Sequence, residues 1–146
     1  MSIWWSLHLR REAASVPLAR KLLMGTMETA GVDPDISFDL SVALTEACAN
    51  AVEHAGTGSG YSVTARIEGD RCRIEVADSG PGLPREPFRA GLPKAVRGPH
   101  AEHGRGLFLI EALVDHVHFQ DRPGHGTVVS FDKVLKWRED ALLRAS

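Results

Sequence analysis

Glu46 and Asn50 are one helical turn apart in a segment whose apolar residues recur with a helical period. A glutamate carboxylate can take a proton from a water or a hydroxyl group, and an asparagine amide oxygen can bind Mg²⁺. The same pair also suits an ordinary solvated helix face, so the spacing alone leaves both interpretations open. Glu53 and His54 fall on the same side of the helix, which ends beside the glycine-rich stretch 56–60.

A second group of residues begins at Asp78, where an alternating strand pattern ends. Its carboxylate can accept a hydrogen bond from an exocyclic amine such as adenine N6. Gly80 and Gly82 have no Cβ atom, so a flat base can lie against the backbone there. These residues are also strong turn signals, and the two interpretations agree if the site is built on the turn. Thr127, after Gly126 at the start of a later strand, can bond the same amine or a water, although this pair also suits a plain hairpin turn.

A third motif, Gly104-Arg105-Gly106-Leu107, precedes a helical pattern. A glycine turn at a helix N-terminus offers free N–H groups and the positive end of the helix dipole to phosphates. Arg105 can add a charge-assisted contact to a terminal phosphate, or it can be a solvated loop charge. Together the motifs supply a general base, a metal-binding amide, an acceptor for an amine and turns for phosphates. This combination predicts an ATP site.

The elements that must hold these motifs follow from the spacing of apolar residues. Strict alternation predicts strands, and a period near 3.6 predicts helices. We expect strands at 3–10, 61–67, 72–78, 117–119 and 129–131, and helices at 15–30, 33–55, 107–114 and 136–144. The last two strands are expected to form a hairpin that pairs Val117 and Phe119 with Val129 and Phe131. Residues 83–103 have no period and contain four prolines, which favours an ATP lid. The predicted fold is a two-layer α/β (α+β) sandwich, with a mostly antiparallel sheet of about five strands and three main helices on one face.

Length and composition limit the function further. The 146 residues predict one domain, 1–146, and a formal net charge of −2 lacks the basic excess typical of nucleic-acid-binding proteins. No signal peptide or apolar run of transmembrane length is evident, and Cys48 and Cys72 have no metal-ligand spacing. We therefore expect a cytoplasmic protein without a membrane partner. His116 and His118 share a strand face, but no third metal ligand accompanies them.

The four motifs, carried by residues 43–55, 76–82, 103–110 and 126–127, resemble those of the Bergerat-fold (GHKL) ATPases and kinases. The resemblance covers nearly the whole chain. Within that superfamily the chain is most similar to bacterial anti-sigma-factor serine/threonine kinases of the RsbW and SpoIIAB type. The resemblance implies that ATP and Mg²⁺ bind, and that a small anti-anti-sigma (STAS-type) partner is phosphorylated on a serine or threonine. It also implies that a sigma factor is bound.

The resemblance implies a role for each motif residue as well. Glu46 would be the catalytic base and Asn50 the Mg²⁺ ligand. Arg20 is the nearest match to the helix-one arginine that the family uses at its partner surface. The other nucleotide contacts would come from Asp78, Gly80, Gly82 and Thr127 at adenine and from Gly104, Arg105 and Gly106 at the phosphates, with Leu107 beside them.

Two other functions remain open. The chain can be a regulatory module that binds a nucleotide and sequesters a partner without phosphoryl transfer, although Glu46 argues against this. It can also be the detached catalytic domain of a histidine kinase, but the residues before the motif helix predict only one strand and one helix, with no helical dimerisation segment. The sequence also permits a homodimer, because Trp4 and Trp5 can leave an apolar surface on the first strand.

Overall fold

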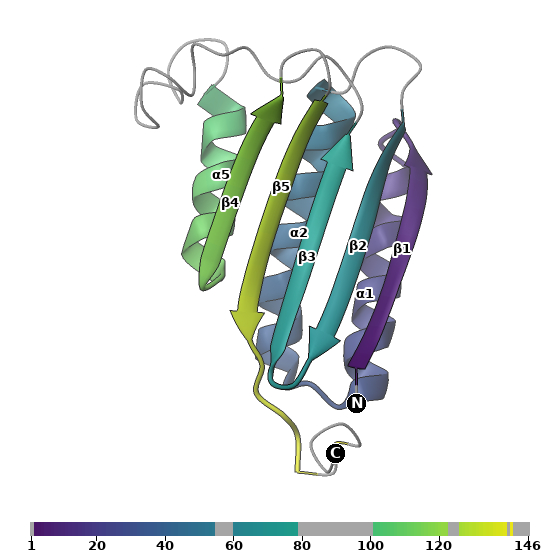
Figure 1. The fold of residues 1–146 in the computed structure, drawn as a ribbon, viewed down its shortest axis with the longest axis vertical. Helices are drawn as coiled ribbons and strands as arrows, with labels where there is room; N and C mark the ends of the chain where they lie inside the picture. The colour runs from purple at the N-terminus through teal and green to yellow at the C-terminus, as the bar shows by residue number, and fades with distance from the viewer. Residues whose placement is uncertain (1, 55–59, 79–100, 123–125, 140, 142–146) are drawn as a thin grey trace.

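The computed structural model describes residues 2–54, 60–78, 101–122, 126–139 and 141, which form one sheet with helices on one face (Figure 1). In chain order the elements are β1 (Ser2–Arg10), α1 (Ser15–Ala30), α2 (Pro34–His54), β2 (Gly60–Glu68), β3 (Arg71–Asp78), α5 (Ala101–Leu113), β4 (His116–Arg122) and β5 (Gly126–Val134). The five strands have the order β1-β2-β3-β5-β4, and every neighbouring pair is antiparallel. The predicted two-layer sandwich is therefore confirmed.

Alternation along the strands produces the buried face of the sheet. In β2 and β3, buried residues such as Val63 and Ile74 alternate with exposed or half-buried ones. The apolar stripe predicted for the second helix is buried at each of its described positions, which are Ile36, Leu40, Leu44, Ala47, Cys48 and Ala51. Its last member, Ala55, lies outside the described residues. The hairpin of β4 and β5 has the predicted register, with Val117 opposite Phe131. None of the described helices is long and apolar enough to cross a membrane.

The fold gathers several element ends at one end of the sandwich (Figure 1). β3 finishes there at Asp78, and β5 starts there at Gly126, because the two strands are antiparallel neighbours with Ala77 opposite Val128. α2 also ends there, and α5 begins there (Figure 1). The residues that the sequence motifs place at element ends are therefore on the same side of the molecule.

Helix α5 begins earlier than the sequence predicts. We expect a lid over 83–103 and a glycine turn before a helix at Leu107, but α5 starts at Ala101 and encloses both Gly104 and Gly106. Gly106 is useful inside the helix because it has no side chain: a Cβ there would lie 3.0 Å from Oε2 of Glu46. The remainder of the predicted lid, 83–100, lies outside the described residues.

The segment after β5 is not the helix that the sequence predicts at 136–144. Residues 135–139 run instead along the turn between α1 and α2, where the N–H of Asp33 donates to Lys136 O and that of Arg138 donates to Gly31 O, both at 2.8 Å. Trp137 bridges to Val32. These partners satisfy the backbone groups without a helix. Residues 140 and 142–144 of the predicted helix lie outside the described part of the chain.

Substitutions at two glycines, one inside α1 and one directly after it, test whether the C-terminal segment packs against the α1–α2 turn. Gly31, the residue after α1, has φ 91°, and a Cβ there would lie 2.5 Å from Ala141 Cβ, whereas a Cβ at Gly25 inside α1 would meet nothing. Gly31→Ala should lower the free energy of unfolding by about 2 kcal/mol or more, because the alanine would have a strained left-handed backbone and its Cβ would crowd Ala141. Gly25→Ala should raise it by about 0.5–1 kcal/mol. Urea denaturation measures both, and equal effects would contradict the docked C-terminal segment.

Candidate functional site

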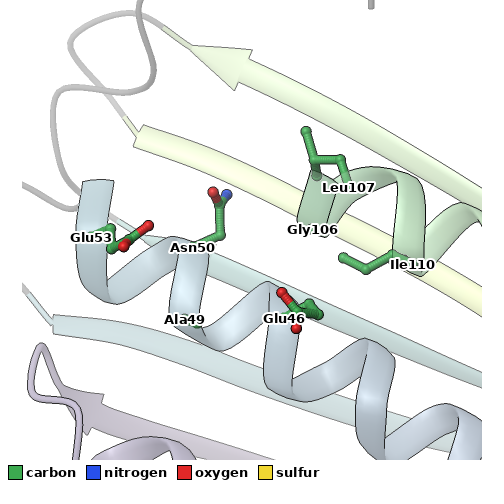
Figure 2. A pocket seen from close by; sticks show the side chains of 7 residues that line it. All are labelled: Glu46, Ala49, Asn50, Glu53, Gly106, Leu107 and Ile110. Carbon is green, nitrogen blue, oxygen red and sulfur yellow. The ribbon is translucent and has the colours of Figure 1, made fainter. Parts of the chain in front are cut away.

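A pocket open to solvent lies between the C-terminal turns of α2 and the middle of α5 (Figure 2). Its volume is about 40 Å³, which is room for about three water molecules. The described residues that line it are Glu46, Ala49, Asn50, Glu53, Gly106, Leu107 and Ile110. The structure thus brings the predicted pair from the first motif together with two residues of the third.

The amide oxygen of Asn50 is buried and has no hydrogen-bond partner among the described residues. The side chain is only 9% exposed and lines the pocket (Figure 2). A buried acceptor without a partner costs about 1–3 kcal/mol, so such an atom calls for a ligand, an ion or a water. Because Mg²⁺ prefers oxygen ligands, Asn50 Oδ1 fits the role of a magnesium ligand.

Glu46, one helical turn before Asn50, approaches α5 closely. Its Oε2 is the atom that a side chain at position 106 would crowd. The glutamate is half-buried, and its carboxylate faces the α5 side of the pocket (Figure 2). Gly106 therefore allows α5 to lie next to the carboxylate, and this contact helps to set the distance between the two helices.

Glu53 lines the pocket but is absent from the set of site residues predicted from the sequence. The signal for it was present, because Glu46, Asn50 and Glu53 are spaced i, i+4 and i+7 on one side of a helix. An exposed glutamate in the last turn of a helix is also an ordinary solvated residue, so the spacing alone did not select it. The structure places it in the same pocket as the other two (Figure 2).

Asp78 and Thr127 form a second part of the site where β3 ends and β5 begins. They are 7% and 2% exposed, and the Thr127 N–H donates to Asp78 Oδ1 at 3.3 Å. The Thr127 hydroxyl oxygen is buried and has no partner among the described residues. This arrangement fixes the carboxylate against the backbone and leaves the hydroxyl available to a ligand.

The pocket lies beside the C-terminal turns of α2, which carry partial negative charge and favour a cation. The residues of α5 that line it, Gly106, Leu107 and Ile110, come from the middle and the second half of that helix. Arg11 binds the end of α2, where its Nε donates to Val52 O at 2.7 Å and its Nη2 donates to Glu53 O at 3.3 Å.

The other predicted residues are described only in part. Gly80 and Gly82 lie outside the described residues, and so does the side chain of Arg105, whose backbone belongs to α5. Gly104 is the fourth residue of α5. Arg20 is exposed on α1 and does not line the pocket.

The buried cysteines and the exposed histidines offer no alternative centre in the described part of the chain. Burial raises the pKa of both the Cys48 and the Cys72 thiol to about 12, so each is neutral near pH 7 and a poor nucleophile. His116 Nδ1 lies 2.9 Å from Asp132 Oδ1. No group of three or more His, Cys, Asp or Glu side chains among the described residues is arranged to hold a metal ion.

Gly126 is required for the position of Asp78, and Gly69 offers a matched control. Both have positive φ, 110° and 55°, but a Cβ at Gly126 would overlap the Asp78 carbonyl oxygen, whereas one at Gly69 would meet nothing. Gly69→Ala should cost only the left-handed backbone strain, about 1–2 kcal/mol. Gly126→Ala should cost about 3 kcal/mol or more and shift the amide resonances of Asp78 and Thr127. Denaturation and NMR spectra measure both effects, and equal losses with unmoved resonances would contradict the close approach.

Comparisons with known proteins agree with this geometry. A family model described as a histidine kinase-like ATPase domain matches residues 9–133. The serine-protein kinase RsbW of Bacillus licheniformis is 36% identical over 129 residues, which cover 82% of this chain and 78% of that protein. The serine-protein kinase RsbW of Staphylococcus aureus is 31% identical over 137 residues, which cover 85% of this chain and 82% of that protein.

A solved structure extends the likeness to the fold. It contains the RsbU and RsbW domains of a Mycobacterium tuberculosis protein and superimposes with a TM-score of 0.66 at 23% identity. The match covers 90% of this chain and 32% of that one, and at this identity it shows the fold alone. With the family match and the relatives above, the chain belongs to the histidine kinase-like ATPase family and, within it, to the serine-protein kinases of the RsbW type.

Proposed function

We propose that this chain is an ATP-dependent protein serine/threonine kinase that acts as an anti-sigma factor in the cytoplasm. It would bind a sigma factor and phosphorylate a small anti-anti-sigma partner of the STAS type. The whole chain, 1–146, would be one ATPase domain. The names of its relatives support the kinase activity, and the resemblance to anti-sigma-factor kinases supports the partners.

One observation carries the proposal: the buried oxygen of Asn50, which has no partner among the described residues, lines a pocket beside Glu46 and the middle of α5. An amide oxygen without a partner suits a metal ligand, and helix N-termini are common phosphate sites. Asn50 would hold Mg²⁺, and the N–H groups of α5 with Arg105 would bind phosphate oxygens. Bound Mg²⁺ would offset the negative charge of the phosphoryl group during transfer.

Glu46 is the candidate catalytic base. It would accept the proton of the partner's serine or threonine hydroxyl while that oxygen bonds to the terminal phosphorus and the bond to the departing ADP breaks. Its half-buried carboxylate is one turn from Asn50 and lies close to Gly106, so it would act at the same end of the nucleotide as the metal ligand.

Asp78 and Thr127 would select adenine. A buried carboxylate fixed by the Thr127 N–H can accept from the N6 amine, and the Thr127 hydroxyl can bond the base or a bridging water. Gly80 and Gly82 would leave room for the flat ring. Guanine presents a carbonyl oxygen where adenine presents its amine, so the carboxylate would disfavour it.

The partner surface is proposed on α1. Arg20 is exposed in the second turn of this helix. α1 begins at the end of the sandwich where α2 ends (Figure 1). A guanidinium there can bind a carboxylate of a partner protein in a bidentate manner. This position would leave the α2–α5 pocket accessible to the nucleotide.

Glu46→Gln should separate phosphoryl transfer from nucleotide binding. The amide keeps the shape of the side chain beside Gly106 but cannot accept the proton, so transfer should fall about 100- to 10,000-fold while the Kd for ATP changes less than about threefold. Transfer of radiolabel from ATP to a candidate anti-anti-sigma protein measures the first, and calorimetry measures the second.

Glu111→Gln is the matched control for this experiment, because Glu111 is an exposed glutamate of α5 that does not line the pocket. It should change neither quantity. A wild-type chain that binds ATP and labels no such partner would instead support a binding module without phosphoryl transfer.

A further inference from the structure

We propose that the Tyr61 hydroxyl sets the spacing between the two parts of the nucleotide site, the part at Asp78 and the part at Asn50. Tyr61 would touch neither the nucleotide nor Mg²⁺, so it is a positioning residue. The inference rests on the proposed ATP site. It adds a residue that determines how well the base and the phosphates of one ATP molecule are bound at the same time.

The backbone of Tyr61 is fixed beside the strand end that carries Asp78. Tyr61 is the second residue of β2 and is 3% exposed. Antiparallel pairing places it opposite Asp78 of β3 on one side and opposite Leu9 of β1 on the other. A strand with a neighbour on each side has little freedom to shift, so Tyr61 and Asp78 keep one position relative to each other.

The side chain of Tyr61 bonds both of the helices that cover this part of the sheet. Its hydroxyl oxygen lies 2.5 Å from Oγ of Ser15, the first residue of α1. Ser15 donates its one hydroxyl proton to Glu12 O at 2.6 Å, so Tyr61 is the donor in the bond between the two hydroxyl groups. The Tyr61 side chain is also hydrogen-bonded to Cys48 of α2. One phenol therefore joins β2 to α1 and to α2.

The contact with α2 falls between two residues of the proposed site. Cys48 is fully buried, two residues after Glu46 and two before Asn50, both of which line the pocket. A shift of this turn of α2 relative to the strands therefore changes the separation of Asn50 and Asp78. The phosphates and the base of one ATP must reach both residues together, and a misplacement of about 1 Å is enough to weaken such binding.

The hydroxyl does more than fill space, since a phenylalanine would have nearly the same volume. The buried serines of α2, Ser37 and Ser41, donate to carbonyl oxygens of their own helix, at Asp33 and Phe38. They join no second helix or strand through these bonds. The Tyr61 hydroxyl instead joins separate elements, and a satisfied buried hydrogen-bond network fixes one arrangement more firmly than apolar contacts do.

A double-mutant cycle tests the proposal through the Kd of a non-hydrolysable ATP analogue in Mg²⁺, measured by calorimetry. Tyr61→Phe removes the hydroxyl alone and should weaken binding about five- to thirtyfold. In the Asn50→Ala background the same change should weaken binding less than about twofold, because one part of the site no longer depends on the spacing. Ser15→Ala breaks the link from the side of α1 and should have the same effect in each background.

The matched control is Thr26→Val. Thr26 Oγ1 accepts a hydrogen bond from the Trp5 indole N–H at 3.0 Å, so this bond also joins a helix to the sheet, and Thr26 does not line the pocket. Both Thr26→Val and Tyr61→Phe should lower the melting temperature by about 2–6 °C. Thr26→Val should nevertheless leave the Kd of the analogue within about twofold in both backgrounds.

The outcomes separate this inference from the proposed function. A loss of affinity in Tyr61→Phe that largely disappears in the Asn50→Ala background supports the positioning role. An equal factor in both backgrounds, or unchanged affinity in a folded Tyr61→Phe variant, overturns the inference and leaves the ATP site standing. A wild-type chain that does not bind the analogue overturns the proposed function, and the inference with it.

Discussion

The close antiparallel packing of α2 against α5 is the constraint on which the candidate site depends. Gly106 permits it, because a Cβ at that position would lie 3.0 Å from a carboxylate oxygen of Glu46. The packing sets the C-terminal turns of α2 opposite Gly106, Leu107 and Ile110 of α5, so that the buried amide oxygen of Asn50 and the Glu46 carboxylate share a single pocket. Two oxygen-bearing side chains beside the negative end of a helix dipole favour a bound cation. The sheet beneath adds Asp78 and Thr127 at the same end of the sandwich (Figure 1).

The site is built at some expense of stability. Asn50 Oδ1 and Thr127 Oγ1 are both buried without partners among the described residues, and each such atom costs about 1–3 kcal/mol when no ligand or water satisfies it. Elsewhere the buried polar groups are paired more fully: the Ser15 hydroxyl lies 2.5 Å from Tyr61 OH and donates to Glu12 O. A third buried atom of this kind, Arg138 Nε, belongs to a guanidinium whose other nitrogens donate to Glu28, whereas Asn50 and Thr127 are residues that the ATP site would use. Such a cost at a functional site is the usual balance between stability and function.

The sequence predicts most of the fold because periodicity reports burial directly. Alternation located β2, β3 and the β4–β5 register, and the apolar stripe located α2. The sequence pattern misplaced the start of α5, because glycines at 104 and 106 suggest a turn. The close approach of Glu46 to Gly106 explains a glycine inside that helix, and it is a tertiary contact that the pattern does not contain. The pattern also predicted a terminal helix where backbone partners from the α1–α2 turn hold an irregular segment. Glu53 was missed because a solvated and a functional glutamate have the same spacing.

The most direct test of the account is the affinity of the Asn50→Ala variant for ATP in Mg²⁺, measured by calorimetry beside the wild type, with thermal unfolding to confirm the fold. If Asn50 Oδ1 binds the magnesium ion, its removal should weaken ATP binding by about tenfold or more. The melting temperature should stay unchanged or rise, because a buried polar atom without a partner is lost and alanine favours the helix. Unchanged affinity together with a lower melting temperature would show that Asn50 serves the fold, and it would contradict the assignment of the pocket to a magnesium–nucleotide complex.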